Sequence, residues 1–408
     1  MATKINVRSP FYIKAEPASG TLTSAQMELY IYTGAKLTTP TSSELRYTLT
    51  KEPISGNNYV VFEIAELVRD YLEIEFDGEY DSQCVWVRPT LTLTKTSGSE
   101  TPTPVDYIAL DGYGYFHEGT NFELSRGLLM SNRSIFRLND SNVTIPVFTE
   151  STNSVAFYYQ GVLKRTQTIP STGVDVNNTN GQIEYISVAG QNESDTPINA
   201  ATYEERVLED GGTLEVSKCL TDFLETIDIG LVDEVWVNYD TGTTFTGASS
   251  TSTEDTKTDI VKIYTVDECK YEPYKVTFIN KFGALQDLWF FKKSVETTDV
   301  TSEQFKASIF NQDTLSYKTY QHQQQAFMAQ GKDRITMNTG FINDDHNAVM
   351  EELLLSEQVW YTKITDEEMV IPVIPRTKTV TYKTSVNDKL VNYTVEFEHA
   401  FDKINNIR

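Results

Sequence analysis

The chain has 408 residues and carries 34 Lys and Arg against 58 Asp and Glu, a formal net charge of -24. A surface this acidic repels polyphosphate, which argues against nucleic-acid binding. The three cysteines, Cys84, Cys219 and Cys269, are far apart and form no CxxC pair, which argues against a disulfide scaffold or a zinc site. The 23 Tyr and 20 Phe, together with abundant Thr and Val, favour β structure, and the length predicts two to four domains.

Neither a membrane span nor an export signal is expected. The sequence holds no run of about 18 apolar residues, and the start, from Met1 to Arg8, has no apolar signal-peptide core. The acidic charge gathers in residues 134–270, with 8 Lys and Arg against 22 Asp and Glu, while residues 271–408 carry 15 against 19. We expect the acidic middle to face solvent or a basic partner, and the last third to sit among other chains.

The first third of the chain predicts a β unit with one short helix. Residues 27–34 alternate apolar and other side chains and end in glycine, as a strand that runs into a turn does. Apolar residues then recur between 64 and 72 at i, i+3, i+4, i+7 and i+8, which is one stripe of an amphipathic helix. A Val-Trp-Val strand follows at residues 85–87.

The same order recurs in the middle of the chain. Residues 214–225 align without gaps with residues 62–73 and share the apolar stripe, residues 154–161 resemble 27–34, and Val-Trp-Val returns at 235–237. Upstream, residues 144–147 correspond to 11–14. These repeats predict a mainly β chain of tandem antiparallel β-sandwich modules, each with one short helix. The modules are expected at residues 1–118 and 134–270, with a linker at 119–133.

Residues 271–408 predict a C-terminal β-rich α+β domain. Strands are expected at 274–280 and 287–293, and a helix at 348–355 precedes Val-Trp-Tyr at 359–361, a faint third copy of the helix–Trp order.

Two further segments of this domain have their own expectations. The alternation of residues 391–397 predicts a strand with one buried face, paired in a hairpin with Val380 and Tyr382. Residues 314–331 have no apolar stripe and form either a solvated loop or an arm that orders against a neighbouring chain.

The sequence shows no motif of a catalytic centre: it lacks a P-loop, GxSxG and HExxH. The Asp344-Asp345-His346 run precedes the helix at 348, where acidic side chains cap free amides, and a metal site is the lesser alternative. His399 is interpreted as a hydrogen-bonded edge residue, and the GxG at 112–114 as an aromatic turn. We expect no enzyme, no catalytic residue, no cofactor and no metal. A two-carboxylate glycoside hydrolase stays open, because such pairs follow no local spacing rule.

Three C-terminal segments carry a resemblance to a known class of proteins. Residues 275–283 (KVTFINKFG), 287–291 (DLWFF) and the closing run 386–408 resemble virion structural proteins of tailed bacteriophages, especially phages of Bacteroidetes-like hosts. The resemblance covers mostly the last 140 residues. It implies a place in the tail, in the baseplate, hub or collar, of a virion assembled in the host cytoplasm. A capsid decoration role is the alternative within this class.

The first hypothesis is therefore a non-enzymatic structural component of a virion that acts through protein–protein interfaces. The C-terminal third would anchor the chain in a homo-oligomeric ring beside other virion proteins, and the acidic modules would project outward. The candidate interface side chains are aromatic: Trp289, Phe290, Phe291, Tyr393, Phe397 and Phe401.

The second hypothesis is a carbohydrate- or receptor-binding adhesin that serves host attachment. Its binding surface would be built from the Ser/Thr/Gly/Asn-rich loops 96–104, 171–199 and 240–259, which would contact a host surface glycan.

Overall fold

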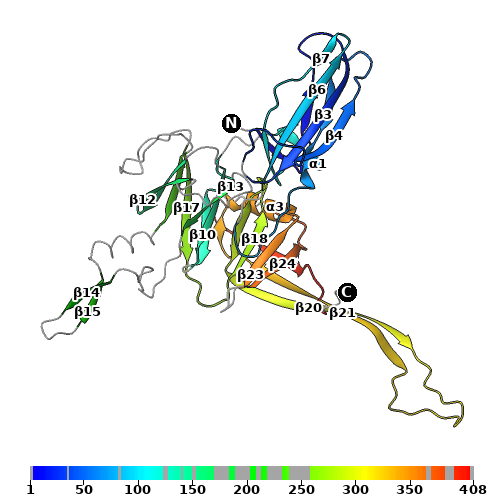
Figure 1. Ribbon diagram of the computed structural model, residues 1–408. Helices are drawn as coiled ribbons and strands as arrows, with labels where there is room; N and C mark the ends of the chain where they lie inside the picture. Colours follow the sequence, from blue (N-terminus) through cyan, green and yellow to red (C-terminus); the bar gives the residue numbers. More distant parts are fainter. Residues whose placement is uncertain are drawn as a thin grey trace.

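The computed structural model describes the chain as mainly β, with several open sheets among the described residues (Figure 1). The described residues are 3–34, 36–80, 84–122, 127–138, 141–148, 153–169, 183–188, 203–207, 213–217, 232–238, 258–363, 369–381 and 390–404. The expectation of a mainly β protein is confirmed.

The first unit is built around a sheet in the order β1-β8-β6-β3-β4, in which β1 is parallel to β8 and the other pairs are antiparallel. Its strands are β1 (Thr3–Asn6), β8 (Tyr107–Leu110), β6 (Val85–Lys95), β3 (Leu22–Tyr32) and β4 (Leu45–Lys51), with β7 (Gly98–Glu100) paired to β6. A two-stranded sheet of β2 (Tyr12–Ala15) and β5 (Val60–Glu63) shares its apolar core, and α1 (Ala65–Arg69) leads from β5 to β6.

The second unit repeats this arrangement strand for strand. Its sheet has the order β9-β17-β16-β11-β12, again with one parallel pair, β9 with β17, at the same end. Its strands are β9 (Ser134–Leu138), β17 (Thr258–Val266), β16 (Glu234–Asn238), β11 (Asn153–Tyr159) and β12 (Val162–Ile169). The pair β10 (Val143–Phe148) and β13 (Ile183–Val188) stands where β2 and β5 stand in the first unit, and β14 (Tyr203–Val207) with β15 (Thr213–Ser217) forms a separate hairpin.

The strands expected from the repeat are present, with two corrections. Residues 213–217 are strand β15, so Val216, the first residue of the expected helical stripe, lies in a strand, and the rest of that stripe lies outside the described residues. The upstream strands also match at a different register. Tyr32 stands opposite Trp86, whereas Ala156, three residues before Tyr159, stands opposite Trp236. Sequence similarity alone could not set this register, because residues 155–158 are apolar and buried at four successive positions and so match an alternating strand at odd as well as even offsets.

The C-terminal unit is a seven-stranded antiparallel sheet in the order β19-β18-β23-β24-β26-β21-β20. Its strands are β19 (Leu285–Phe290), β18 (Tyr274–Ile279), β23 (Val359–Lys363), β24 (Met369–Pro375), β26 (Thr394–His399), β21 (Gln324–Asn338) and β20 (Lys292–Lys306). Helix α3 (His346–Leu355) lies against the sheet, and β22 (Ile342–Asn343) pairs with β25 (Leu390–Val391). A 3-10 turn, η1, spans Phe116–Glu118.

The helix and the Val-Trp-Tyr strand expected here are confirmed as α3 and β23. Strands β19-β18-β23-β24 also repeat the order β4-β3-β6-β8 of the first unit, with a helix again directly before the Trp-bearing strand. The expected hairpin does not form at Val380, because β26 lies between β24 and β21 and pairs with both. Its other residue, Tyr382, lies outside the described residues. The expected helix cap is confirmed in position only. Asp345 is the N-cap residue of α3, but its side chain makes no capping bond, and its carboxylate instead accepts a bond of 2.6 Å from Ser134 Oγ of the second unit.

The turn between β18 and β19, residues 280–284, lies buried where the three units meet. Asn280 Nδ2 donates to the carbonyl of Leu129 at 2.6 Å and to Gln286 Oε1 at 2.9 Å, and Gln286 Nε2 donates to Asn132 Oδ1 at 3.0 Å. On the other side, Tyr113 N donates to the Lys281 carbonyl at 2.9 Å. One polar turn therefore joins the third unit to the first unit and to residues 127–133.

Apolar side chains surround this polar turn. Tyr32, Trp86 and Ile108 of the first unit, Phe148 and Ile183 of the second, and Ala284 of the turn belong to one buried cluster. Leu129, from the expected linker, is buried in the same cluster. The outer faces of the Trp-bearing strand β6 and its neighbours therefore serve as the surface between units, while their inner faces fill the core of the first unit.

We predict that Gly283→Ala loosens this junction. Gly283 has φ +78, and an added Cβ would lie 2.7 Å from the backbone nitrogens of both Asp111 and Gly112. The backbone strain and the overlap together are expected to lower the free energy of unfolding by about 2–4 kcal/mol. Denaturant unfolding of the variant and of the unmodified chain measures this loss of free energy. The matched control is Gly56→Ala, with φ +95 but nothing within 4 Å, for which about 1 kcal/mol is expected. Equal losses would show that the close approach at Gly283 is unimportant.

Glu352 on α3 makes the junction sensitive to pH. Its side chain is 1% exposed, accepts a hydrogen bond from Ser131 Oγ and lies 3.4 Å from the donor Lys281 N. Burial raises the pKa of Glu352 to about 7. Between its unfolded pKa of about 4.3 and pH 7, the folded chain holds a proton that the unfolded chain has lost. This group therefore makes the fold less stable as pH rises through that window.

We predict that Glu352→Gln flattens the pH dependence of the melting temperature between pH 5 and 7.5. The amide carries no titrating proton, so this residue's contribution to the slope disappears. Thermal unfolding at several pH values measures the slope. The control is Glu351→Gln, at the half-buried neighbouring position on the same helix, which is expected to leave most of the slope in place. A wild-type slope retained in Glu352→Gln would contradict the assignment.

Candidate functional site

The feature that stands out from the three packed units is a long β-hairpin, which we call the arm (residues 292–338, β20 and β21). Figure 1 shows it projecting away from the rest of the chain. The two strands stay paired from Lys292 opposite Asn338 to Lys306 opposite Gln324. Among the described strands, β26 alone pairs with the hairpin from outside, at residues 334–338 of β21 in the root. Along the rest of the arm, the described residues form a two-stranded ribbon.

The arm carries apolar side chains into solvent. Nine of the twenty large exposed apolar side chains in the described part of the chain lie between residues 295 and 328. They are Val295, Val300, Phe305, Phe310, Leu315, Tyr317, Tyr320, Phe327 and Met328. The rings of Phe305 and Phe327 contact one another edge to face, with centroids 6.3 Å apart, and are still 46% and 62% exposed. Such a concentration of exposed apolar surface is typical of an interaction site.

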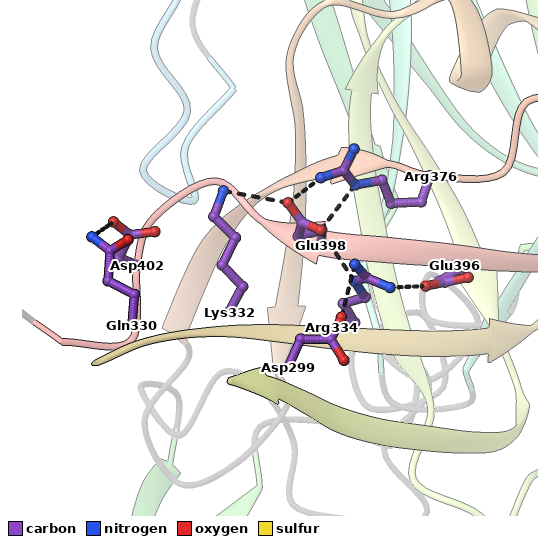
Figure 2. A network of polar contacts seen from close by, with 8 residues as sticks. All are labelled: Asp299, Gln330, Lys332, Arg334, Arg376, Glu396, Glu398 and Asp402. Carbon is purple, nitrogen blue, oxygen red and sulfur yellow. Dashed lines mark hydrogen bonds and ion pairs between the residues drawn. The ribbon is translucent and has the colours of Figure 1, made fainter. Parts of the chain in front are cut away.

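The root of the arm is held by a buried carboxylate (Figure 2). Glu398, 1% exposed, accepts hydrogen bonds from Arg376 Nε at 2.9 Å, Arg334 Nε at 3.1 Å and Lys332 Nζ at 3.4 Å. The Arg376 guanidinium is the main reason that the pKa of Glu398 falls to about 2. Three cations from β21 and the segment after β24 thus converge on one anion of β26, which fixes the direction of the arm.

The C-terminal segment adds a second attachment. Lys403 N donates to the Gly331 carbonyl at 2.8 Å, and Lys403 Nζ bonds the Asp333 carboxylate at 2.9 Å. Gln330 Nε2 donates to Asp402 at 3.1 Å (Figure 2). These bonds extend the support of β21 up to residue 330, so the free part of the arm begins there.

The six aromatic side chains proposed for an interface take two different places. Trp289, Phe290, Phe291, Tyr393 and Phe397 are at most 8% exposed. Phe290 and Phe397 meet edge to face at 5.8 Å in the core of the C-terminal unit. Phe401 is 49% exposed and lies beside the arm root, its ring 5.2 Å from that of His399. Five of these side chains therefore pack inside the chain and offer little surface to a partner.

Sequence reasoning did not find the Glu398 cluster. The alternation of residues 391–397 indicates one buried face, which leaves Glu396 and Glu398 on the solvent side. Glu396 is indeed half exposed. Glu398 is buried because Arg376 of the segment after β24 and Arg334 of β21 cover it. These cations lie 22 and 64 positions away in the sequence. The sequence feature closest to this site is the segment 314–331, which has no apolar stripe and is expected to be a loop or an arm. This segment lies within the arm.

Within the described residues, the other candidate residues form no cluster that suggests a catalytic or metal site. In the described residues, no group of three or more His, Cys, Asp or Glu side chains gathers as it would around a metal ion. No helix within those ranges is long and apolar enough to cross a membrane. Gly112 lies close to the backbone of Lys281 and Phe282 at the junction, and Gly114 lies against the side chain of Phe122. His399 Nε2 lies 3.1 Å from Tyr361 Oη. Of the three loops proposed for glycan binding, residues 96–104 form a turn around β7, and most of the other two lie outside the described residues.

Comparison with known proteins adds no family. No family model matches this chain, and no curated protein matches it. Among solved structures, the crystal structure of CBD12 from CALX1.2 is similar to 45% of this chain and 70% of that one, at 11% identity and a TM-score of 0.16. A likeness this weak carries no argument about fold or function, so any functional proposal depends on the geometry of the chain.

We predict that Glu398→Gln loosens the arm root. The amide keeps the size of the side chain but leaves Arg376 and Arg334 without their anion, which is expected to lower the free energy of unfolding by about 1–3 kcal/mol. Hydrogen exchange of amides in residues 332–338 and 394–399 is expected to accelerate. The matched control is Glu396→Gln, a half-exposed partner of Arg334, with an expected change within about 0.5 kcal/mol. Equal effects of the two substitutions would contradict a special role for Glu398.

Proposed function

We propose that this chain is a non-enzymatic structural protein that assembles with copies of itself through the arm. The observation that carries this proposal is a hairpin with exposed apolar side chains and a buried, charged root. An isolated two-stranded hairpin is marginally stable in water. Exposed aromatic rings on such a ribbon gain stability only when a partner covers them. The firm root keeps the arm extended, so that it reaches beyond the surface of its own chain.

The three packed units supply the rigid base that such an arm needs. We propose that the first two are tandem β-sandwich modules, at residues 1–118 and 134–270, and that residues 271–408 form the assembly domain. The identical strand order and the single parallel pair in both sheets support the duplication. Residues 119–133 join them, and Leu128, Leu129 and Met130 in that segment are buried, so the connection is packed and not a free tether.

The setting that we propose is the virion of a tailed bacteriophage, with this chain in a ring of the tail or baseplate beside other virion proteins. The resemblance of residues 275–283, 287–291 and 386–408 supports it, as does an assembly surface carried by the same third of the chain. The acidic charge of residues 134–270 favours an outward position for the second module, because like charges repel one another across a crowded interface.

The interface that we propose differs from the aromatic set expected from the sequence. The arm side chains Phe305, Phe327 and Met328 take the place of the buried Phe290 and Phe397, and Phe401 stays a candidate because it is exposed at the arm root. The aromatic residues of β19 and β26 serve the fold that orients the arm.

We predict that shortening the arm abolishes self-association and leaves the fold intact. Residues 302–329 would be replaced by Asn-Gly between Thr301 and Gln330, a pair that stands opposite one another in the hairpin, so that the contacts of the root are kept. The purified full chain is expected to form oligomers at high concentration and the shortened chain to stay monomeric, with cooperative thermal unfolding retained. Sedimentation velocity measures both.

A milder variant tests the same surface without a deletion. Phe305→Ser with Phe327→Ser is expected to weaken association by about tenfold or more, since buried aromatic residues dominate interfaces. The control is Phe341→Ser, which removes a ring that is 67% exposed but lies outside the arm. A wild-type chain that remains monomeric at high concentration, or a shortened chain that still assembles, would overturn the proposed function.

A further inference from the structure

The arm presents two unpaired strand edges, and they differ in length. Among the described residues, β20 is the last strand of the seven-stranded sheet, and no strand pairs with its outer edge from Lys292 to Lys306. On the other side, β26 covers residues 334–338 of β21 and Lys403 bonds Gly331, which leaves the edge free over residues 324–330. That free stretch stands opposite residues 301–306 of β20. Both edges are thus open at the same level of the arm.

The long edge has few of the features that usually prevent strand addition. Lysine, proline and inward charges commonly protect edge strands. Between Ser294 and Phe305, β20 has no lysine and no proline, and it is rich in threonine and valine, which favour strands. Two irregularities in the pairing, between Lys292 and Val295 and between Glu303 and Gln304, lie near its two ends. This edge is therefore suited to accept another strand.

We propose that β20 of one copy pairs with the free edge of β21 of the next copy, so that the arms join head to tail into a continuous sheet. This inference rests on the proposed function and specifies its interface. With the arms pointing the same way, strands would alternate as β21, β20, β21 and β20, each antiparallel to its neighbours as within the hairpin itself. A closed ring of this kind leaves no free edge at the tip.

Two arguments favour this pairing over a symmetric one. A two-fold pairing of β20 with β20 leaves the β21 edge open, and a pairing of β21 with β21 leaves β20 open. The charges of the two strands also favour the pairing of β20 with β21. β20 carries Glu296, Asp299 and Glu303 with no basic residue between them, whereas residues 324–331 carry no charge at all and Lys332 follows. Symmetric pairing of β20 would bring its acidic side chains together, but β21 offers it a neutral to basic partner.

Mixed single-cysteine variants test this pairing in the full chain. In a background of Cys84→Ala, Cys219→Ser and Cys269→Ser, Ser302→Cys marks β20 and Ala329→Cys marks β21. These two positions stand opposite one another in the hairpin, so they lie at the same height on the arm. Mild oxidation forms a disulfide only where the two Cα atoms lie within about 7 Å, which adjacent strands satisfy and strands two apart, at about 9.6 Å, do not. Denaturing gels then separate single chains from cross-linked dimers.

The expected result is a covalent dimer in the mixture of Ser302→Cys and Ala329→Cys, with only background in either variant alone. Ser99→Cys, on the exposed β7 of the first unit, is the control partner for Ser302→Cys and should give background. Cross-linking of Ser302→Cys alone would indicate symmetric β20 pairing, and that of Ala329→Cys alone symmetric β21 pairing. Either result, or no cross-link in the mixture, overturns the inference.

Sedimentation of the same samples separates this failure from failure of the proposed function. If the unmodified chain forms oligomers that the shortened arm abolishes, but the mixture gives no cross-link, the arm assembles the protein in another geometry and only the head-to-tail pairing is overturned. If the unmodified chain stays monomeric, the proposed function and the pairing both fail.

Discussion

The architecture of the chain depends on one buried polar turn, residues 280–284 between β18 and β19. Asn280 bonds the backbone at Leu129, the Lys281 carbonyl accepts a bond from Tyr113, and Gly283 lies against Asp111 and Gly112. Buried polar groups favour a single geometry, because any other arrangement leaves a donor or acceptor without a partner. The turn therefore fixes how the three units are placed, and the apolar cluster around Trp86 supplies the burial that stabilises this placement.

A second buried polar group, the carboxylate of Glu398, attaches the arm to this base. Glu398 lies on β26, a strand that also contributes to the core of the C-terminal unit. Its carboxylate accepts hydrogen bonds from cations on β21 and on the segment after β24 (Figure 2). Breaking such a cluster on one side leaves uncompensated charge in the interior. The arm thus has a firm base and a free end, which is the arrangement expected of an element that meets a partner outside its own chain.

The repeated units show how one strand pattern serves two purposes. In β6, Val85 and Val87 face the core of the first unit, while Trp86 faces the other units. In β16, Val235 and Val237 face the core of the second unit, while Trp236 packs with Tyr158 at 4.9 Å on the opposite face. The Val-Trp-Val signature therefore marks a strand that is buried on both faces, which explains why it is apolar throughout and does not alternate.

The sequence by itself determined the β character of the chain, the first helix, the helix before Trp360 and the two Val-Trp-Val strands. These depend on local periodicity, which a single segment displays. The tertiary structure decided the features that depend on distant partners. It placed β26 between β24 and β21, buried Phe290 and Phe397 inside the chain, and brought Arg376, Arg334 and Lys332 to Glu398. It also showed residues 292–338 as one hairpin whose outer half pairs with no other strand in the described part of the chain. Strand pairing and edge exposure are properties of the whole sheet, so no window of sequence could reveal them.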